Sequence, residues 1–376
     1  MTLRDLVADL VAIDSVNPDL VPGGAGEGEI ARFIAAWLER AGAEVRIDEV
    51  APGRWNVIGV ARGRAGGRTL LLNGHTDTVG LDGYERPLEP RVEGDRLYGR
   101  GSYDMKGGTA AALWACARAV ELGLAGDVVV AAVCDEEFAS IGTQALARQV
   151  RADAAIVTEP TSLGVCIAHK GFAWLEIEVA GTAAHGSDPA LGVDAIVKTG
   201  PILTALGALG DALATRPHPS LGPGSVHASL IEGGRELSTY PDRCVLQLER
   251  RTLPGETRET VEREIEDLLE RCRAADPGLV VSQRTLLVRD PFEVPEAATI
   301  VQSVLRAASA ELGAPPPLVA VPYWADSAFI AAAGIPTVLF GAGGAGAHAT
   351  EEWVSVSQLV STTRILVAVA RELCAT

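Results

Sequence analysis

Short apolar runs that end in histidine or acidic residues constrain the fold of this chain more than any other feature. Segments with helical periodicity alternate with these runs over roughly the first 160 residues. Such alternation predicts an α/β domain, in which a mostly parallel sheet is flanked by helices on both faces. The expected strands are Thr69–Leu72, Asp127–Cys134, Ala154–Thr158 and Ile335–Phe340, and the expected helices are Glu27–Ala41, Thr109–Gly123, Ile141–Val150 and a long C-terminal helix from about Ser357.

The middle of the chain has a different order of expected secondary-structure elements. Its elements follow the order strand, helix, strand, strand, helix, strand, which is typical of the split βαβ or ferredoxin-like arrangement. We therefore expect an α+β domain at residues 172–288, inserted into an α/β domain formed by residues 1–171 and 289–376, with linkers near Lys170–Gly171 and Arg289–Pro295. The expected elements are Phe172–Ala180, Val193–Ala214, Val226–Ile231, Arg243–Thr252, Thr257–Arg273 and Leu279–Val288.

Length, charge and cysteine spacing exclude several classes of protein. The chain has 376 residues, 48% of them hydrophobic, which is enough for two cores. The sequence contains no run of about 18 uncharged apolar residues that would indicate a membrane span. A net charge of −17 without basic clusters argues against nucleic acid or an anionic membrane as a partner. Six widely spaced cysteines indicate reduced thiols rather than disulfides or a zinc-thiolate site, and we expect a cytoplasmic protein.

Potential metal ligands follow each of these strands. In an open α/β sheet, ligands bind beyond the carboxyl ends of the strands, so side chains at those ends should converge on one crevice. The residues are His75 and Asp77 after the first run, Asp135, Glu136 and Glu137 after the second, Glu159 after the third, His348 after the last strand, and Asp104 in a Gly-rich loop.

Each of these residues has a simpler explanation when taken alone. A single His75 is more often a core or loop histidine, Asp77 a turn residue or helix cap, and the acidic run 135–137 a solvated loop. Three adjacent acids at the end of a buried strand repel one another, however, and bound cations would offset that cost. The agreement among the strand ends therefore favours a metal site.

The residue types indicate which metals would suit this site. Imidazoles and carboxylates without thiolates suit Zn²⁺, with Co²⁺ or Mn²⁺ as possible substitutes. A pair of such ions needs one carboxylate to bridge it and further ligands on each side, and the residues present are numerous enough. Glu136 is then left over, as an acid that is adjacent to a ligand and directed at the same crevice.

Seven sequence motifs occur in order along nearly the whole chain. They are Asn-Gly-His-Thr-Asp-Thr-Val (73–79), Gly-Arg-Gly-Ser-Tyr-Asp-Met-Lys-Gly-Gly (99–108), Asp-Glu-Glu-Phe (135–138), Thr-Glu-Pro (158–160), Gly-Thr-Ala-Ala-His-Gly-Ser-Asp-Pro (181–189), Arg-Thr-Leu-Pro-Gly-Glu-Thr (251–257) and Ala-His-Ala-Thr-Glu-Glu-Trp-Val (347–354). Together they resemble the M20 family of metallopeptidases and deacylases. That family includes acetylornithine deacetylase, succinyl-diaminopimelate desuccinylase, aminoacylase-1 and glutamate carboxypeptidase.

The resemblance implies a dimetal centre. The implied ligands are Asp104 as the bridge, His75 and Glu159 for one ion, and Glu137 and His348 for the other.

Two further acids would support this centre. Asp77 would accept the remaining ring N–H of His75 and fix its tautomer. Glu136 would be the general base, which takes a proton from a metal-activated water and later gives it to the departing amine. The family also implies a cis peptide bond between Asp104 and Met105.

Other implied residues lie in the inserted domain, which is the lid and dimerisation domain in this family. His185 would stabilise the tetrahedral oxyanion, typically in the active site of the other subunit of a homodimer. Arg251 would grip a substrate carboxylate, although Arg250 is adjacent and only one of the two can point inward from a strand. His227 stands where an asparagine is common, and would contact the substrate carboxylate or the oxyanion.

Glutamate at position 159 bears on the substrate. In this family it is associated with deacylases that act on N-acyl amino acids, whereas peptidases more often have aspartate there. We therefore expect a deacylase of the acetylornithine deacetylase type, with a dipeptidase or carboxypeptidase as the alternative, and a small N-acyl amino acid or short peptide as the substrate. A non-catalytic, ligand-binding relative is a third possibility, but the implied ligands and Glu136 are all present.

Overall fold

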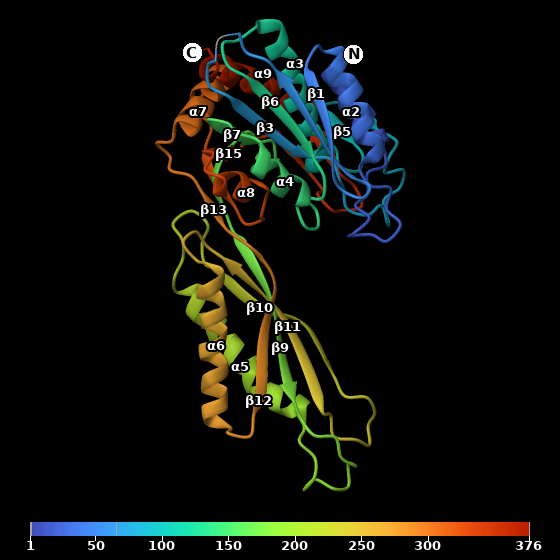
Figure 1. The fold of residues 1–376 in the computed structure, drawn as a ribbon, viewed down its shortest axis with the longest axis vertical. Helices are drawn as coiled ribbons and strands as arrows, with labels where there is room; N and C mark the ends of the chain where they lie inside the picture. Colours follow the sequence, from blue (N-terminus) through green and yellow to red (C-terminus); the bar gives the residue numbers. More distant parts are fainter. Residues whose placement is uncertain (1, 65, 376) are drawn as a thin grey trace. The chain divides into compact units, whose positions relative to one another are not determined.

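The structure, a computed structural model, describes residues 2–64 and 66–375 and divides them into two compact units (Figure 1). The first unit comprises Met1–Ile167, Val294–Val319 and Ala325–Thr376, and the second comprises Ala168–Glu293 and Ala320–Trp324. The second unit thus extends a few residues beyond the expected 172–288 and includes a short later segment as well. Met1, Ala65 and Thr376, which fall in the expected first domain, lie outside the described residues.

Most strands of a nine-stranded sheet lie in the first unit, and the four central strands of this sheet are parallel. Every residue of these four strands is buried, which explains why they appear in the sequence as unbroken apolar runs. The strands at the margins pair antiparallel, and the sequence patterns did not identify them. In order, the path is β1 (Glu44–Ala51), β2 (Arg54–Ala61), β6 (Val128–Val133), β3 (Leu70–His75), β7 (Ala154–Val157), β15 (Thr337–Leu339), β8 (Val165–His169) and β13 (Phe292–Glu293), with β14 (Leu318–Val321) also paired to β8.

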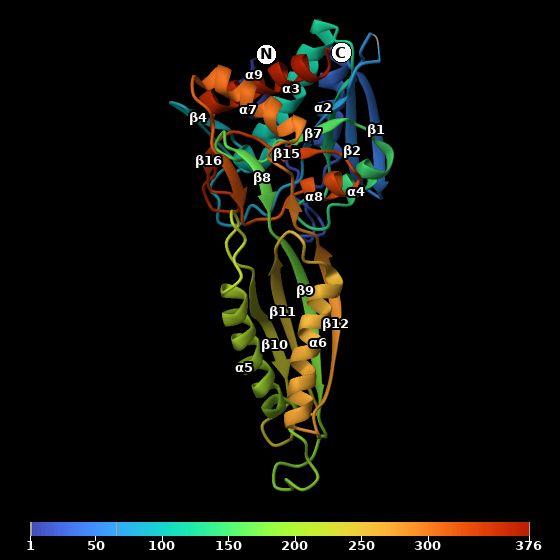
Figure 2. The ribbon, with the colours of Figure 1, turned by 90° about the vertical axis from the view of Figure 1, so that its left-hand side faces the viewer.

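Helices cover both faces of this sheet, as expected for the fold class (Figure 2). Local sequence fixes several helix ends: Thr2 and Asp5 form a capping box at the start of α1, and Gly123 ends α3 in the left-handed conformation. On one face lie α1 (Leu3–Ala12), α2 (Gly28–Arg40), α3 (Gly107–Leu122), α7 (Thr299–Leu312) and α9 (Val356–Leu373), and on the other lie α4 (Ile141–Gln149) and α8 (Ser327–Ala332).

A smaller sheet and a short turn complete the first unit. The turn, η1, precedes α3 and carries the cis peptide bond between Asp104 and Met105 that the resemblance implied. The elements are β4 (Arg91–Glu93), β5 (Arg96–Tyr98), η1 (Ser102–Lys106), β16 (Gly344–Ala345) and β17 (Trp353–Ser355).

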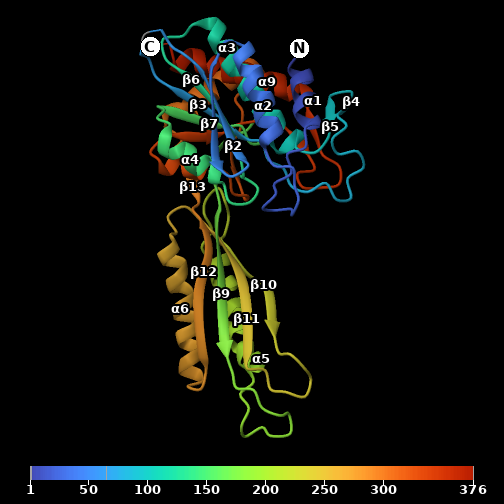
Figure 3. The same cartoon turned by 45° about the vertical axis from the view of Figure 1, so that its right-hand side comes forward.

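The second unit is a four-stranded antiparallel sheet with two helices (Figure 3). The strand order β10-β11-β9-β12, with a helix in each crossover, is the split βαβ arrangement predicted from the sequence. Apolar side chains that alternate along β9 pack with the two helices in a core of their own. The elements are β9 (Gly171–Ala180), α5 (Ala195–Ala214), β10 (Ser225–Gly233), β11 (Arg243–Thr252), α6 (Arg258–Ala275) and β12 (Val280–Arg289).

Helix α5 is unusual in its composition. Of the helices in the described residues, it alone is long and apolar enough to cross a membrane, and only 22% of its most apolar stretch is buried. The core helix of a soluble protein can pass the same test, and α5 packs its buried residues, which include Ile202 and Leu206, into the core of the second unit. The remainder of the helix presents apolar side chains to the surface, among them Ile196 and Val197.

Candidate metal centre

The predicted ligands converge at one edge of the sheet in the first unit. His75 is the last residue of β3, and Glu137 and Glu159 follow the ends of the parallel strands β6 and β7. His348 comes from the loop between β16 and β17, and Asp104 from η1. Because parallel strands end at the same edge, residues that are far apart in sequence meet there.

Asp104 lies between the two histidines. Its Oδ1 is 3.2 Å from His75 Nε2, and its Oδ2 is 3.5 Å from His348 Nε2. Glu159 Oε1 lies 3.9 Å from the same nitrogen of His75, and Glu137 Oε2 lies 3.0 Å from that of His348. Two groups of three side chains could therefore each hold a metal ion, because the ligand atoms within each group lie within 4.8 Å of one another. The groups are His75, Asp104 and Glu159, and Asp104, Glu137 and His348.

The carboxyl groups of this cluster repel one another. Burial raises the pKa of both Glu136 and Glu159 well above the usual value, and nearby carboxylates raise it further. Burial also raises the pKa of Glu137, with the charge of Asp104 as the next contribution. Divalent cations between these oxygens would offset both costs, so the donor set suits bound metal.

The two histidines are held among these acids. Burial acts to lower the pKa of His75, but its hydrogen bond to Asp104 and the charges of Glu136 and Glu159 raise the pKa well above the usual value. Hydrogen bonds to Asp104 and Glu137 raise the pKa of His348 to about 10. The surrounding carboxylates therefore favour a cation beside each imidazole ring. Zinc accepts imidazole nitrogen and carboxylate oxygen as ligands, so the donor set suits this ion.

Glu136 belongs to neither group of three. Its Oε2 is 4.0 Å from His75 Nε2, and its side chain is 12% exposed. It therefore lies beside the two candidate ligand groups rather than within either of them.

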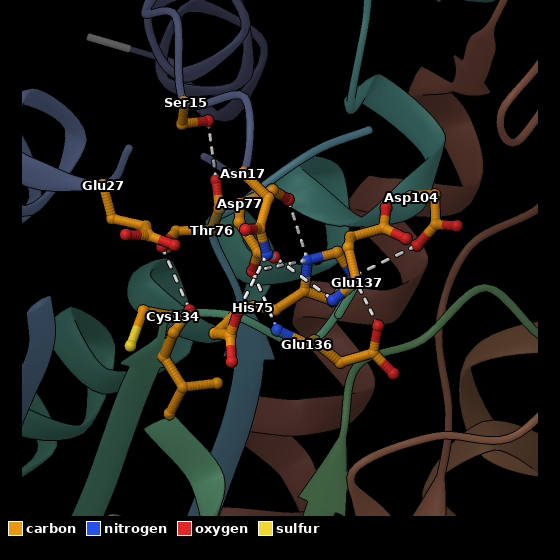
Figure 4. Close-up of polar contacts among 12 residues, drawn as sticks. Ser15, Asn17, Glu27, His75, Thr76, Asp77, Asp104, Cys134, Glu136 and Glu137 are labelled. Carbon is orange, nitrogen blue, oxygen red and sulfur yellow. Dashed lines mark hydrogen bonds and ion pairs between the residues drawn. The ribbon is translucent and has the colours of Figure 1, made fainter. Parts of the chain in front are cut away.

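Asp77 supports the cluster in a different way from that expected. The nearest acceptor for His75 Nδ1 is the backbone carbonyl of Asp77, at 3.0 Å, while the carboxylate oxygen is 3.7 Å away. The carboxylate instead accepts the backbone N–H groups of Glu136 and Glu137, at 3.1 and 3.2 Å. Asp77 thus fixes the backbone that carries two site residues, as well as the ring of His75 (Figure 4).

Glu352 holds the backbone of the loop that carries Asp104, as Asp77 does for the segment that carries Glu136 and Glu137. Its carboxylate accepts the backbone N–H groups of Gly101, Tyr103 and Asp104, each at 2.9 Å, and pairs with Arg100 at 2.9 Å. Glu352 and Arg100 are both buried. The sequence alone did not single out Glu352, because Glu351 beside it has the same chemistry.

Asn17 and Asp326 were also missed. Asp326 at the start of α8 accepts a hydrogen bond from Thr143 Oγ1 at 2.6 Å, and its other oxygen has no hydrogen-bond partner among the described residues. Burial raises the pKa of Asp326 to about 6. Asn17 donates to Asp77 from the loop after α1. Neither residue is adjacent in sequence to a predicted ligand, so strand-end placement could not find them.

The remaining predicted residues belong to the second unit. His185 is exposed, and its Nδ1 lies 2.7 Å from the hydroxyl oxygen of Ser187. His227 is exposed on β10, opposite Glu249 of β11. The structure does not bring these histidines into the cluster of ligands within the first unit.

The two adjacent arginines of β11 have different environments. Arg250 is fully buried and pairs with Glu256 at 2.7 Å and Glu264 at 2.9 Å. Arg251 is 33% exposed, contacts Glu249 at 2.7 Å and lies over the ring of Phe172. Arg250 is therefore committed to internal ion pairs, and Arg251 is the one that a ligand can reach.

Comparisons with known proteins show which family this chain resembles. Residues 71–372 match the model of peptidase family M20/M25/M40. An acetylornithine deacetylase from Aliivibrio fischeri is 32% identical over 290 residues, which cover 74% of this chain and 75% of the relative. An N-formyl-4-amino-5-aminomethyl-2-methylpyrimidine deformylase from Bacillus subtilis is 29% identical over 97% of this chain and 92% of its own length. A solved structure from Bacillus subtilis, described as a dinuclear metal binding peptidase from the M20 family, has the same fold with a TM-score of 0.77 at 18% identity, covering 100% of this chain and 98% of that one.

The Glu352–Arg100 pair generates a stability prediction. Replacing Glu352 with Gln (Glu352→Gln) should lower the free energy of unfolding by about 3–5 kcal/mol, because it leaves the buried Arg100 without its carboxylate partner. Urea denaturation followed by circular dichroism measures this loss. The matched control is Glu351→Gln, since Glu351 is 66% exposed and its pair with Arg91 is worth less than about 1 kcal/mol. Equal losses in the two variants would contradict the assignment.

Proposed function

The chain belongs to peptidase family M20/M25/M40 and is a hydrolase, and we propose that it cleaves the amide bond of an N-acyl amino acid. The observation that carries this proposal is Asp104 shared by two ligand groups, with the buried acid Glu136 beside them. The likeness to an acetylornithine deacetylase and the glutamate at position 159 support an N-acyl amino acid as substrate. The six cysteines are buried thiols, which suits a reducing compartment, and we place the protein in the cytoplasm.

Each ligand group would hold one divalent cation, most simply zinc, with cobalt or manganese as substitutes. Asp104 would help to hold both ions, because it belongs to both groups and its two oxygens face different histidines. When bound, such a pair supplies a nucleophilic water at neutral pH and polarises the substrate carbonyl.

Glu136 would move the proton. Its carboxylate takes a proton from the attacking water and later gives it to the amine nitrogen as the C–N bond breaks. Its carboxylate is 4.0 Å from His75 Nε2, beside the ligand group that His75 shares with Asp104 and Glu159. Asp77 keeps the backbone of Glu136 in place through the N–H that its carboxylate accepts.

Residues of the second unit would complete the reaction. His185 would donate a hydrogen bond to the tetrahedral oxygen, and its contact with Ser187 orients the ring. Arg251 would bind the carboxylate of the amino acid product, since Arg250 is taken up by Glu256 and Glu264. His227 would contact the same carboxylate or the oxyanion.

We also propose that the protein is a homodimer that pairs through the second unit. Strand β10 is at one end of the four-stranded sheet, and most of its residues are exposed. Exposed apolar side chains on β10 and α5 form what we call the α5–β10 surface, and a second copy of the chain is the occupant that an unpaired sheet edge of this kind accommodates. Its residues are Ile196, Val197, Leu203, Leu230 and Ile231.

A substrate panel tests the proposed reaction. Purified protein loaded with zinc, cobalt or manganese should hydrolyse N-acetyl amino acids, with release of the free amine measured by a ninhydrin or chromatographic assay. Hydrolysis of dipeptides alone would favour the alternative, a dipeptidase or carboxypeptidase, for which the likeness to an M20 peptidase structure is the motivation. Turnover of neither class, with cations bound, would favour a ligand-binding protein.

Glu136→Gln tests the base. We expect kcat to fall by about 10²–10⁴, because the amide cannot accept the proton, while the number of bound cations stays the same. Steady-state kinetics and metal analysis of the same preparation measure both quantities. Glu121→Gln, an exposed change on α3, should leave both unchanged. Loss of cations in Glu136→Gln would instead make Glu136 a ligand.

Leu230→Asp tests the dimer and the role of His185 together. Leu230 is 66% exposed, and a carboxylate there should produce monomers in light scattering. If His185 serves the partner subunit, the monomer should lose kcat by about 10²–10³, as His185→Ala should, because each site lacks one oxyanion donor. The control is Leu286→Asp, since Leu286 is 42% exposed on β12 at the opposite edge of the same sheet and should leave a dimer. A fully active monomer would show that His185 acts within its own chain.

A further inference from the structure

Asn17 lies between two buried carboxylates of the first unit. Its amide nitrogen donates to Asp77 Oδ2 at 2.8 Å and to Asp135 Oδ1 at 3.0 Å, so both of its N–H groups are used (Figure 4). All three side chains are at most 1% exposed. Without this amide, the two carboxylates would face each other with no donor between them.

The two carboxylates hold opposite ends of one short segment. Asp77 accepts the backbone N–H groups of Glu136 and Glu137. Asp135 precedes both residues, has a φ of 69°, and accepts the backbone N–H of Ile141 at the start of α4. Asn17 therefore connects the two groups that set the path of the backbone through the proposed base and a proposed ligand.

Asp135 also contacts a buried arginine, Arg54, which pairs with the buried Glu27. Arg54 contacts Asp135 at 3.0 Å and Glu27 at 2.6 Å, and it also pairs with the half-exposed Asp19. The three buried carboxylates of Asp77, Asp135 and Glu27 thus share one guanidinium group and one side-chain amide. The amide of Asn17 is a neutral donor between Asp77 and Asp135, and it offsets part of the cost of burying the two carboxylates together.

The backbone around Asn17 keeps its side chain in place. The N–H of Asn17 donates to the carbonyl of Thr78 at 2.9 Å, beside the bridge between Val16 and Thr78. The side-chain oxygen accepts the backbone N–H of Asp19 at 3.0 Å. The backbone and the side-chain oxygen of Asn17 are therefore both fixed by hydrogen bonds. The position of its amide nitrogen, and of the two carboxylates that it contacts, is fixed as a result.

From this geometry we propose that Asn17 is a positioning residue for the Asp135–Glu136–Glu137 segment, acting through Asp77 and Asp135. The proposal rests on the proposed function, in which Glu136 is the base and Glu137 a cation ligand. It predicts that Asn17 affects proton transfer and the binding of one of the two cations, although it touches neither substrate nor metal.

Asn17→Leu tests this role, because leucine has a similar branched shape and no donor. We expect kcat to fall by about 10- to 100-fold with KM changed less than about threefold, and the affinity for one of two Co²⁺ ions to fall by about 10- to 100-fold. Co²⁺ titration followed by visible absorption measures the binding without any substrate. Ser303→Ala is the control, since Ser303 is buried and its hydrogen bond to Glu372, at 2.7 Å, joins α7 to α9 away from the site.

The outcomes separate this proposal from the proposed function. Unchanged kcat and unchanged Co²⁺ affinity in Asn17→Leu would overturn it, as would equal losses in Ser303→Ala. If Asn17→Leu does not fold, Asn17→Ala removes the donor without adding bulk, and a Co²⁺ affinity equal to that of the unaltered protein would overturn the proposal. If the unaltered protein hydrolyses no amide, the proposed function fails, while the Co²⁺ titration still decides whether Asn17 positions the ligand segment.

Discussion

The loops of the first unit are constrained by one requirement: several carboxyl groups must lie close together at one edge of a sheet. Burial and mutual repulsion raise the pKa of Glu136, Glu137 and Glu159, which means that bringing these carboxylates together is electrostatically unfavourable. Two further acids, which are buried and belong to neither ligand group, stabilise the backbone around this cluster. Asp77 accepts backbone N–H groups on one side of the cluster, and Glu352 accepts them on the other.

This arrangement requires backbone conformations that ordinary loops avoid. Asp135 and His348 both have positive φ values, of 69° and 61°, at the points where their segments turn toward the cluster. Gly108 in the first turn of α3 lets the helix approach β7 closely, since a Cβ there would lie 2.0 Å from the carbonyl oxygen of Thr158. Strain and close packing of this kind are kept where the surrounding hydrogen bonds determine the backbone.

Much of the fold followed from the sequence because the central strands are buried on both sides. Their apolar runs marked β3, β6, β7 and β15, and the polar residues after them marked the ligands. The marginal strand β1 and the helices α1 and α7 were not predicted, because half-exposed elements give weaker patterns. Strand β2 is mostly buried and was also not predicted, since Asn56 and Gly59 interrupt its apolar run.

The site residues that were missed share one property. Asn17, Glu352 and Asp326 form hydrogen bonds with groups that are remote in sequence, and no local pattern distinguishes them from ordinary loop residues. A remote contact also explains why the backbone carbonyl of Asp77, rather than its carboxylate, is the nearest acceptor for His75 Nδ1. The carboxylate is engaged by the backbone of Glu136 and Glu137, a contact that the sequence does not reveal.

Neighbouring residues of the same type have opposite roles at three places in this chain. Arg250 is buried in ion pairs while Arg251 is accessible, because successive residues of a strand point to opposite faces. Glu352 is buried against η1 while Glu351 is exposed. Glu137 contacts His348 while Glu136 stays outside both ligand groups. In each pair the chemistry is the same and only the direction of the side chain differs, so the backbone determines which residue is buried in an ion pair and which one is accessible or stands beside the proposed ligands.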